Sequence, residues 1–216
     1  MTLGLIGKKL GMTQIFSEDG VLIPVTLIQA GPCPIIQKKD KERDGYAALK
    51  LGFGKKPARA VKKPESGVFK KLDIEPVRLM REFRIDDTSE YEVGQHLNVE
   101  VFEENERVDI TGVTKGRGFA GTIKRWGTHR GPETHGSHYH RRVGSLGGSS
   151  DPSRVYKGKK MPGHYGNRKR TMMNLKIVKL DKEKNLVAIK GSVPGHVNSY
   201  VFISKKQKKA AKAARR

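Results

Sequence analysis

The stretch from Met12 to Gln29, MTQIFSEDGVLIPVTLIQ, predicts the fold. Two apolar runs rich in β-branched residues flank the sequence Ser-Glu-Asp-Gly at residues 17–20. An Asp-Gly pair between such runs is typical of a β-hairpin turn. The uncharged run that continues to Gln37 approaches the length of a membrane span, but it contains three prolines. We therefore interpret residues 20–37 as two strands joined by a turn.

Further strand candidates lie before residue 113 and after residue 170. LNVEVF from Leu97 and NLKIVKL from Asn174 alternate apolar and polar side chains, as expected for a half-solvated antiparallel sheet or barrel wall. Residues 181–185, DKEKN, predict a second hairpin turn. The remaining strand candidates are YAALKLG from Tyr46, RVDITG from Arg107, NLVAIKG from Asn185 and YVFI from Tyr200. The pattern predicts a mainly β fold, an antiparallel β-barrel built from residues 1–112 and 171–204.

A different pattern lies between residues 55 and 87. PESGVFKKL from Pro64 and EPVRLMREF from Glu75 each open near a proline and carry an acidic residue in the first turn. Both features are typical of helix N-termini. We therefore expect a small helical insertion between the strands.

Positive charge is concentrated in two segments. Of the 58 residues from Val113 to Arg170, 14 are Lys or Arg, 12 are Gly, and only Glu133 and Asp151 are acidic. Residues 205–216 add seven basic side chains and no acidic one, while the remainder of this chain of net charge +22 holds 23 basic and 20 acidic residues. A nearly neutral globule thus carries a basic extension and a basic tail. A polyanion is the natural partner, because each neutralised phosphate releases counterions.

The extension, residues 113–170, shows no sustained helix or strand period. A segment of this length without its own core is either disordered or ordered by a partner. The basic tail is rich in Ala and Lys and is expected to be disordered when free.

The sequence Gly116-Arg-Gly-Phe-Ala-Gly121 matches the dinucleotide-binding pattern G-x-G-x-x-G. Its context does not fit, because no helix-length periodic segment follows, no βαβ unit surrounds it, and His140 and Arg141 stand where an acidic residue would bind the ribose. The better interpretation is that the glycines let the backbone approach phosphates, which neighbouring cations neutralise.

Five histidines between His129 and His164 suggest a metal site, but the segment offers few carboxylates, no Cys and many cations that would repel a metal ion. Neutral His and the aromatic residues Trp126, Tyr139, Tyr156 and Tyr165 fit stacking on bases and hydrogen bonding to RNA better. For Trp126, packing of the extension on itself is an equal alternative. We predict no metal and no cofactor.

Enzyme interpretations lack a nucleophile paired with a base. No P-loop, nucleophile elbow or paired carboxylates occur, and the lone Cys33 between two prolines is typical of a small buried residue. Lys8 and Lys9 follow the first apolar run rather than precede it, which is the reverse of a secretory signal. We expect a cytoplasmic protein with no membrane or small-molecule partner.

Several blocks resemble one known family. GLIGKKLGMTQIF from Gly4, FAGTIKRWG from Phe119, THGSHYHRRVGSLG from Thr134, RVYKGKKMPGHYGN from Arg154 and NLVAIKGSVPG from Asn185 are similar, in this order, to bacterial large-subunit ribosomal protein L3. The blocks are long and span the chain. The resemblance implies a translation-factor-like β-barrel with a helical insertion and an extension that penetrates ribosomal RNA.

The resemblance also implies a role and partners. It implies a structural constituent of the large ribosomal subunit that binds 23S rRNA near its 3′ end, assists early assembly, and contacts ribosomal proteins such as L14 and L19. The tip of the extension, Gly147, Gly148, Ser149 and Ser150, would approach the peptidyl transferase centre. Some relatives carry a methylated glutamine at the position of Gly148, which has no side chain to modify.

Candidate RNA contacts follow from these arguments, with no catalytic residue among them. They are Lys8, Lys9, Lys115, Arg117, Lys124, Arg125, Trp126, His129, Arg130, His138, His140, Arg141, Arg142, Arg154, Lys157, Lys159, Lys160, Arg168, Lys169 and Arg170. Two other classes stay open: a metal-dependent nucleic-acid enzyme, which would purify with stoichiometric metal, and a nonspecific DNA-compacting protein, which would bind duplex DNA and ribosomal RNA equally.

Overall fold

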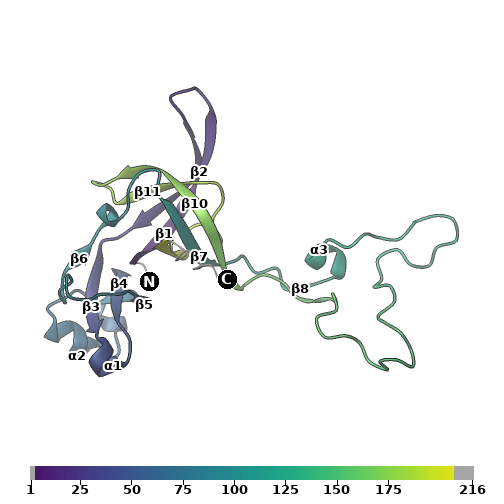
Figure 1. Cartoon of the computed structure of the whole chain (residues 1–216), viewed down its shortest axis with the longest axis horizontal. Coiled ribbons are helices and arrows are strands. Elements are labelled where there is room, and N and C mark those ends of the chain that lie inside the picture. The colour runs from purple at the N-terminus through teal and green to yellow at the C-terminus, as the bar shows by residue number, and fades with distance from the viewer. Residues whose placement is uncertain (1–2, 207–216) are drawn as a thin grey trace, which may run out of the picture. The chain divides into compact units, whose positions relative to one another are not determined.

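The computed structural model describes residues 3–206 and contains a closed antiparallel barrel (Figure 1). Its strand order is β1-β12-β7-β10-β11-β2. The bounds are Gly4–Phe16 for β1, Leu22–Ala30 for β2, Arg107–Val113 for β7, Lys169–Asp181 for β10, Leu186–Lys190 for β11 and Tyr200–Lys205 for β12. The predicted mainly β fold with an antiparallel barrel is therefore confirmed.

The barrel closes because β-branched side chains alternate toward its interior. Val108 and Ile110 on β7 and Val201 and Ile203 on β12 are fully buried, while their neighbours in sequence face outward. Each such side chain contributes about 1.5–3 kcal/mol relative to an exposed position. The two predicted hairpin turns are present, with Gly20 at φ 75° in the first and Asn185 at φ 51° in the second.

A second sheet of order β5-β4-β3-β6 packs against the barrel. Its strands are β3 Cys33–Lys39, β4 Ala48–Lys55, β5 Val77–Arg84 and β6 His96–Leu97. Leu49 and Leu51 join the barrel core, whereas Ile36 and Val77 pack on Phe69 of helix α2, Lys63–Lys71. Strands β3 and β4 are thus mostly buried, which agrees with the apolar runs in both, whereas the charged side chains of β5 are exposed.

Two secondary-structure predictions are wrong. The segment EPVRLMREF forms strand β5, which pairs along β4, and only α2 and the 3₁₀ turn η1, Ala58–Ala60, give helix in the predicted insertion. Its apolar residues also alternate, so pairing with β4 overrides the local helix signal. In LNVEVF only Leu97 belongs to a strand, since η2, Val99–Val101, follows at once. The remaining short helix is α1, Lys41–Asp44.

The chain divides into two compact units, a globular unit that ends at Val113 and resumes at Lys169, and an extension unit, Thr114–Arg168. Val113, Lys169 and Arg170 belong to paired barrel strands, so the extension is shorter at both ends than the sequence predicts. The extension unit contains β8 Phe119–Ala120, helix α3 Thr122–Trp126 and β9 Gly163–His164. From residue 207 onward, the predicted basic tail lies outside the described residues.

Candidate nucleic-acid interface

The extension unit begins as an irregular two-stranded ribbon. Backbone hydrogen bonds join Thr114 N to Arg168 O at 3.0 Å, Arg117 N to Tyr165 O at 2.9 Å and Tyr165 N to Gly118 O at 2.8 Å. The short strands β8 and β9 continue the pairing. The sequence has no strand period here because glycines interrupt it, yet the backbone groups still find partners.

Gly166 allows the two sides of this ribbon to approach closely. Its φ is 74°, and a Cβ atom at this position would collide with the carbonyl oxygen of Lys115. Any L-residue would therefore be strained and would push the two sides apart. The glycine is used for backbone packing within the extension unit itself.

Helix α3 is attached to the returning chain through one carbonyl group. The carbonyl oxygen of Met161 accepts a hydrogen bond from Arg125 Nη1 at 2.7 Å and another from Trp126 Nε1 at 2.9 Å. Trp126 is 42 % exposed, so it packs locally on one side and leaves part of its surface accessible. The structure shows these local contacts of Trp126, and its role as an RNA contact stays a prediction.

Arginine side chains lie over aromatic rings throughout the extension unit. The guanidinium carbon lies 4.9 Å from the ring centre in the pair Arg125 and Trp126, and 5.7–5.8 Å in the other three. Those three pairs are Arg117 with Tyr165, Arg142 with Tyr139, and Arg154 with Tyr156. A guanidinium stacked on a ring still presents its N–H edge for bidentate hydrogen bonds to an anion such as phosphate, although Arg125 already uses Nη1 for Met161 O.

Almost all cations of the extension unit are exposed. It contains twelve Lys and Arg residues against two carboxylates, and only Arg125 is partly buried. Arg130 is paired with Glu133. The predicted contacts Lys115, Arg117, Lys124, His129, His138, Arg141, Arg142, Arg154, Lys157, Lys159, Lys160 and Arg168 are all exposed here, and Lys169 and Arg170 are exposed on β10.

The loop beyond α3 is held by a few polar contacts, and the residues predicted to form its tip are exposed. His140 O accepts the Gly131 N–H at 2.9 Å, and His140 Nδ1 lies 2.9 Å from Pro132 O. The tip residues Gly147, Gly148, Ser149 and Ser150 are all exposed. A Cβ atom on Gly148 would lie 2.9 Å from Asp151 O, so this backbone tolerates a side chain only after a shift.

Lys9 is placed differently from its prediction as an RNA contact. Its side chain is 8 % exposed, and Nζ donates hydrogen bonds to Val193 O at 2.8 Å and Gly195 O at 3.1 Å. The ammonium group is therefore used inside the globular unit, where it holds the loop before β12. The neighbouring Lys8 is half-buried, so part of its side chain remains accessible to a partner.

The histidines do not gather into a metal site. Within residues 3–206, no group of three or more His, Cys, Asp or Glu side chains could hold a metal ion. Helix α3 after the Gly116–Gly121 motif has five residues, too short for the dinucleotide-binding unit that the motif would need.

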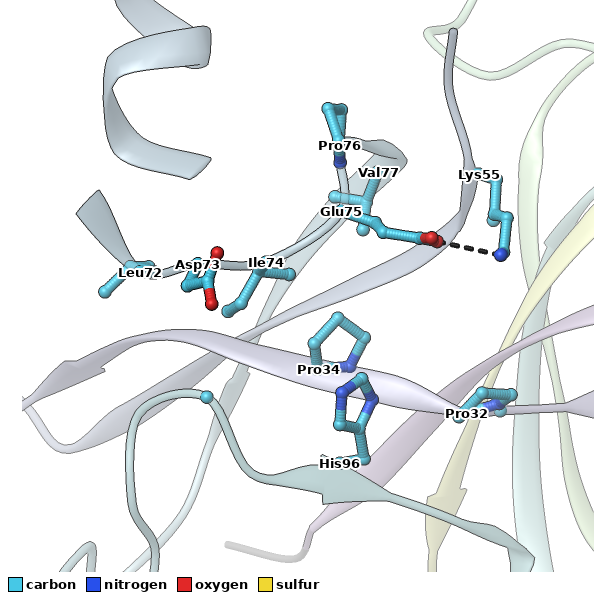
Figure 2. A pocket seen from close by; sticks show the side chains of 13 residues that line it. Pro32, Pro34, Lys55, Leu72, Asp73, Ile74, Glu75, Pro76, Val77 and His96 are labelled. Carbon is cyan, nitrogen blue, oxygen red and sulfur yellow. Dashed lines mark ion pairs between the residues drawn. The ribbon is translucent and has the colours of Figure 1, made fainter. Parts of the chain in front are cut away.

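The globular unit has a pocket of about 410 Å³ between β3 and the segment Leu72–Val77 (Figure 2). Figure 2 shows Pro34 beside His96, with the Lys55–Glu75 ion pair at the rim. The described lining is mostly proline and aliphatic side chains and pairs no nucleophile with a base.

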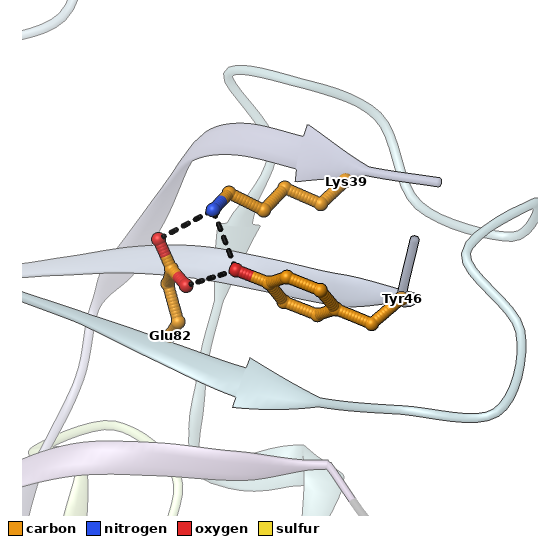
Figure 3. Close-up of polar contacts among 3 residues, drawn as sticks. All are labelled: Lys39, Tyr46 and Glu82. Carbon is orange, nitrogen blue, oxygen red and sulfur yellow. Dashed lines mark hydrogen bonds and ion pairs between the residues drawn. The ribbon is translucent and has the colours of Figure 1, made fainter. Parts of the chain in front are cut away.

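Three polar side chains form a network on the second sheet (Figure 3). Lys39 Nζ lies 2.7 Å from Tyr46 Oη and 3.1 Å from Glu82 Oε1, and Tyr46 Oη donates to Glu82 Oε2 at 3.0 Å. The hydrogen bond to Tyr46, with that to Glu82, raises the pKa of Lys39. Burial opposes ionisation of Glu82, but the bonds from Lys39 and Tyr46 outweigh it and lower its pKa.

One exposed aromatic residue was missed by the sequence argument. Phe119 in β8 is 81 % exposed, the largest exposed fraction among the large apolar side chains described. A phenylalanine between glycines in a cationic segment is the signal that could have identified it as a stacking surface.

The site and the fold together define a class of protein: a small β-barrel protein with an exposed cationic extension suited to a polyanion. Comparisons with known proteins identify the family. The family model for ribosomal protein L3 matches residues 80–188.

Two relatives are similar over nearly their whole length. The large ribosomal subunit protein uL3 of Acetivibrio thermocellus is 52% identical over 200 residues, covering 92% of this chain and 94% of the relative. The protein of the same name from Pelotomaculum thermopropionicum is 52% identical over 213 residues, covering 99% of each. The chain therefore belongs to the ribosomal protein L3 family, and the resemblance noted in the sequence is confirmed.

A search of residues 3–206 for membrane-spanning helices found none with sufficient length and apolar character.

Proposed function

We propose that this chain is a structural constituent of the large ribosomal subunit that binds 23S rRNA through its extension unit. The observation that carries the proposal is the exposure of eleven of the twelve Lys and Arg side chains in Thr114–Arg168. Family membership supports the same role, since both relatives are named as large-subunit proteins.

The role is electrostatic and structural. Exposed cations neutralise phosphates that would otherwise repel one another, and the release of counterions drives binding. Arginines held on aromatic rings present their N–H edges in a fixed orientation, which lowers the entropy cost of each contact. Glycines with open space at the Cβ position, such as Gly118 and Gly121, would let backbone groups approach the RNA closely.

The tip at residues 147–150 would approach the peptidyl transferase centre. Gly147, Gly148, Ser149 and Ser150 offer backbone and hydroxyl groups but no group suited to act as a base near neutral pH. Peptide-bond chemistry would therefore belong to the RNA, and the tip would support its geometry. The proposal also includes binding near the 3′ end of the RNA, early entry into assembly, and contacts with L14 and L19.

Incorporation into subunits tests the main proposal. A tagged copy of the chain should sediment with large subunits, whereas a copy with Arg154, Lys157, Lys159 and Lys160 changed to Gln should incorporate several-fold less. Lys62→Gln with Lys63→Gln removes exposed cations from the globular unit and serves as the control. Wild-type protein that stays free of subunits would contradict the proposal.

The tip requires a separate test, because any side chain at Gly148 meets the Asp151 carbonyl. Gly148→Ala introduces that contact alone, and Gly148→Trp adds bulk. We expect both variants to enter subunits and only Gly148→Trp to alter tRNA binding or sensitivity to drugs that bind the centre. If assembled Gly148→Trp subunits behave as wild type, the tip does not lie near the peptidyl transferase centre.

A further inference from the structure

The end of the β1–β2 hairpin lies outside the barrel. Strand β12 pairs with β1 only over Gly4–Lys8, and β11 pairs with β2 only over Val25–Gln29. In these registers residues 14–16 therefore pair only with residues 22–24, while Met12 and Thr13 pair with Thr26 and Val25 of β2. This hairpin tip, residues 12–24, projects beyond the barrel in Figure 1. In the described registers no third strand pairs with residues 12–16 or with residues 22–23, while the carbonyl oxygen of Pro24 accepts a hydrogen bond from Gly191 N at 2.9 Å.

One face of the hairpin tip is apolar and exposed. The register places Phe16 opposite Leu22 and Gln14 opposite Pro24, so these side chains and Met12 share one face. Met12 is 55 % exposed, Phe16 64 % and Leu22 47 %, and Val21 in the turn is 60 % exposed. An apolar patch of this kind on a soluble protein usually marks an interaction surface.

The charge of the hairpin tip excludes RNA as the natural occupant. From Leu10 to Gln37 the sequence contains no Lys or Arg, although the whole chain has 44, and its only charges are Glu18 and Asp19 in the turn. A phosphate backbone would find no cation within residues 12–24 and two carboxylates that repel it. A second copy of the chain is disfavoured too, because it would bring like charges together.

We propose that the hairpin tip is a docking surface for a different protein, a basic chain that lays an apolar face on Met12, Phe16 and Leu22 and brings Lys or Arg to Glu18 and Asp19. Apolar contact supplies the affinity and the two carboxylates fix the orientation. The open strand edges add backbone donors and acceptors that an extended partner segment can use. The inference rests on the proposed function, which places this partner in the same particle.

Site-specific photo-crosslinking in purified large subunits tests the inference. One variant carries p-benzoylphenylalanine in place of Phe16 and a second in place of Phe119, which is the exposed aromatic of the extension unit. We expect the probe at Phe16 to cross-link a protein at a peptide that contains Lys or Arg, and the probe at Phe119 to cross-link RNA. Failure of both variants to enter large subunits would instead contradict the proposed function.

The inference would be overturned if the Phe16 probe cross-links RNA, an acidic peptide or a second copy of this chain. It would also be overturned if the Phe16 probe cross-links nothing while the Phe119 probe reacts. A substitution gives independent evidence. Phe16→Ser with Leu22→Ser changes only exposed positions and should lower the content of the cross-linked partner in subunits at least tenfold. Val68→Ser, at an apolar position of α2 that is 48 % exposed, should leave it unchanged.

Discussion

At the scale of single residues, Cys33 and Lys9 are side chains of reactive or charged type that the globular unit buries in its structure. Cys33 is fully buried, and its Sγ–H lies 3.5 Å from the carbonyl oxygen of Ile6. Burial raises the pKa of this thiol to about 12. The thiolate, which is the reactive form, is therefore suppressed at neutral pH.

We expect Cys33 to resist alkylation in the folded protein. Iodoacetamide at pH 8 should modify it at least a hundredfold more slowly than in the urea-unfolded chain, because both access and ionisation are lost on folding. Mass spectrometry of timed samples measures the rate. Equal rates in the two states would show that the thiol is accessible.

Lys9 provides the second residue-scale prediction. Lys9→Met keeps the side-chain length but leaves the Val193 and Gly195 carbonyls without their donor, so it should destabilise the protein by about 1–3 kcal/mol. Urea unfolding measures the change. Lys8→Met, at the half-buried neighbour, should cost no more than about 0.5 kcal/mol. If Lys9→Met is as stable as wild type, the ammonium does not hold the loop.

The sequence could not separate these two lysines. Lys8 and Lys9 share the same local surroundings, and the acceptors of Lys9 lie 184 and 186 residues further along the chain. Only the closed barrel brings the loop before β12 to β1. Exposure of the arginines in the extension was predictable, because that segment has too few apolar residues to bury them.

At the scale of elements, hairpins were predictable and strand β5 was not. The turn at residues 17–20 and the turn at 181–185 carry their own local signals. In β5 the local pattern favours a helix, and pairing of Leu49 with Phe83 and Phe53 with Leu79 decides the outcome. Such cross-strand contacts depend on a partner strand that local periodicity does not describe.

The network of Lys39, Tyr46 and Glu82 links strands β3 and β5 and predicts a pH dependence. The pKa of Glu82 is lowered from 4.5, so its stabilisation is complete above that pH and is lost as the pH falls through the folded-state pKa. The pKa of Lys39 is raised from 10.5, so its stabilisation is complete below that pH and is lost as the pH rises.

Glu82→Gln should therefore lower the melting temperature at pH 7, and the difference from wild type should shrink as the pH falls below about 4.5. Melting curves from pH 3 to 8 measure this. Glu18→Gln, which removes an exposed carboxylate from the β1–β2 turn, is the control. A difference that stays constant down to pH 3 would mean that the charge on Glu82 does not matter.

At the scale of the whole molecule, charge is segregated by unit. The extension unit carries twelve Lys and Arg side chains against two carboxylates, while the hairpin tip of the globular unit has only two acidic charges. This division was readable from the sequence, because it is a property of composition. Which of these cations contact phosphate depends on the RNA, so the sequence could not predict it.

The salt dependence of RNA affinity tests the central claim, that exposed cations of the extension unit bind ribosomal RNA. If half of its twelve cations meet phosphates, the log–log slope against salt should be about −4 to −5 for a large-subunit RNA fragment. Arg141→Gln with Arg142→Gln should flatten the slope by about one to two, and Lys62→Gln with Lys63→Gln should leave it unchanged. A wild-type slope shallower than about −1, or one that the Arg141 and Arg142 changes do not alter, would contradict the account.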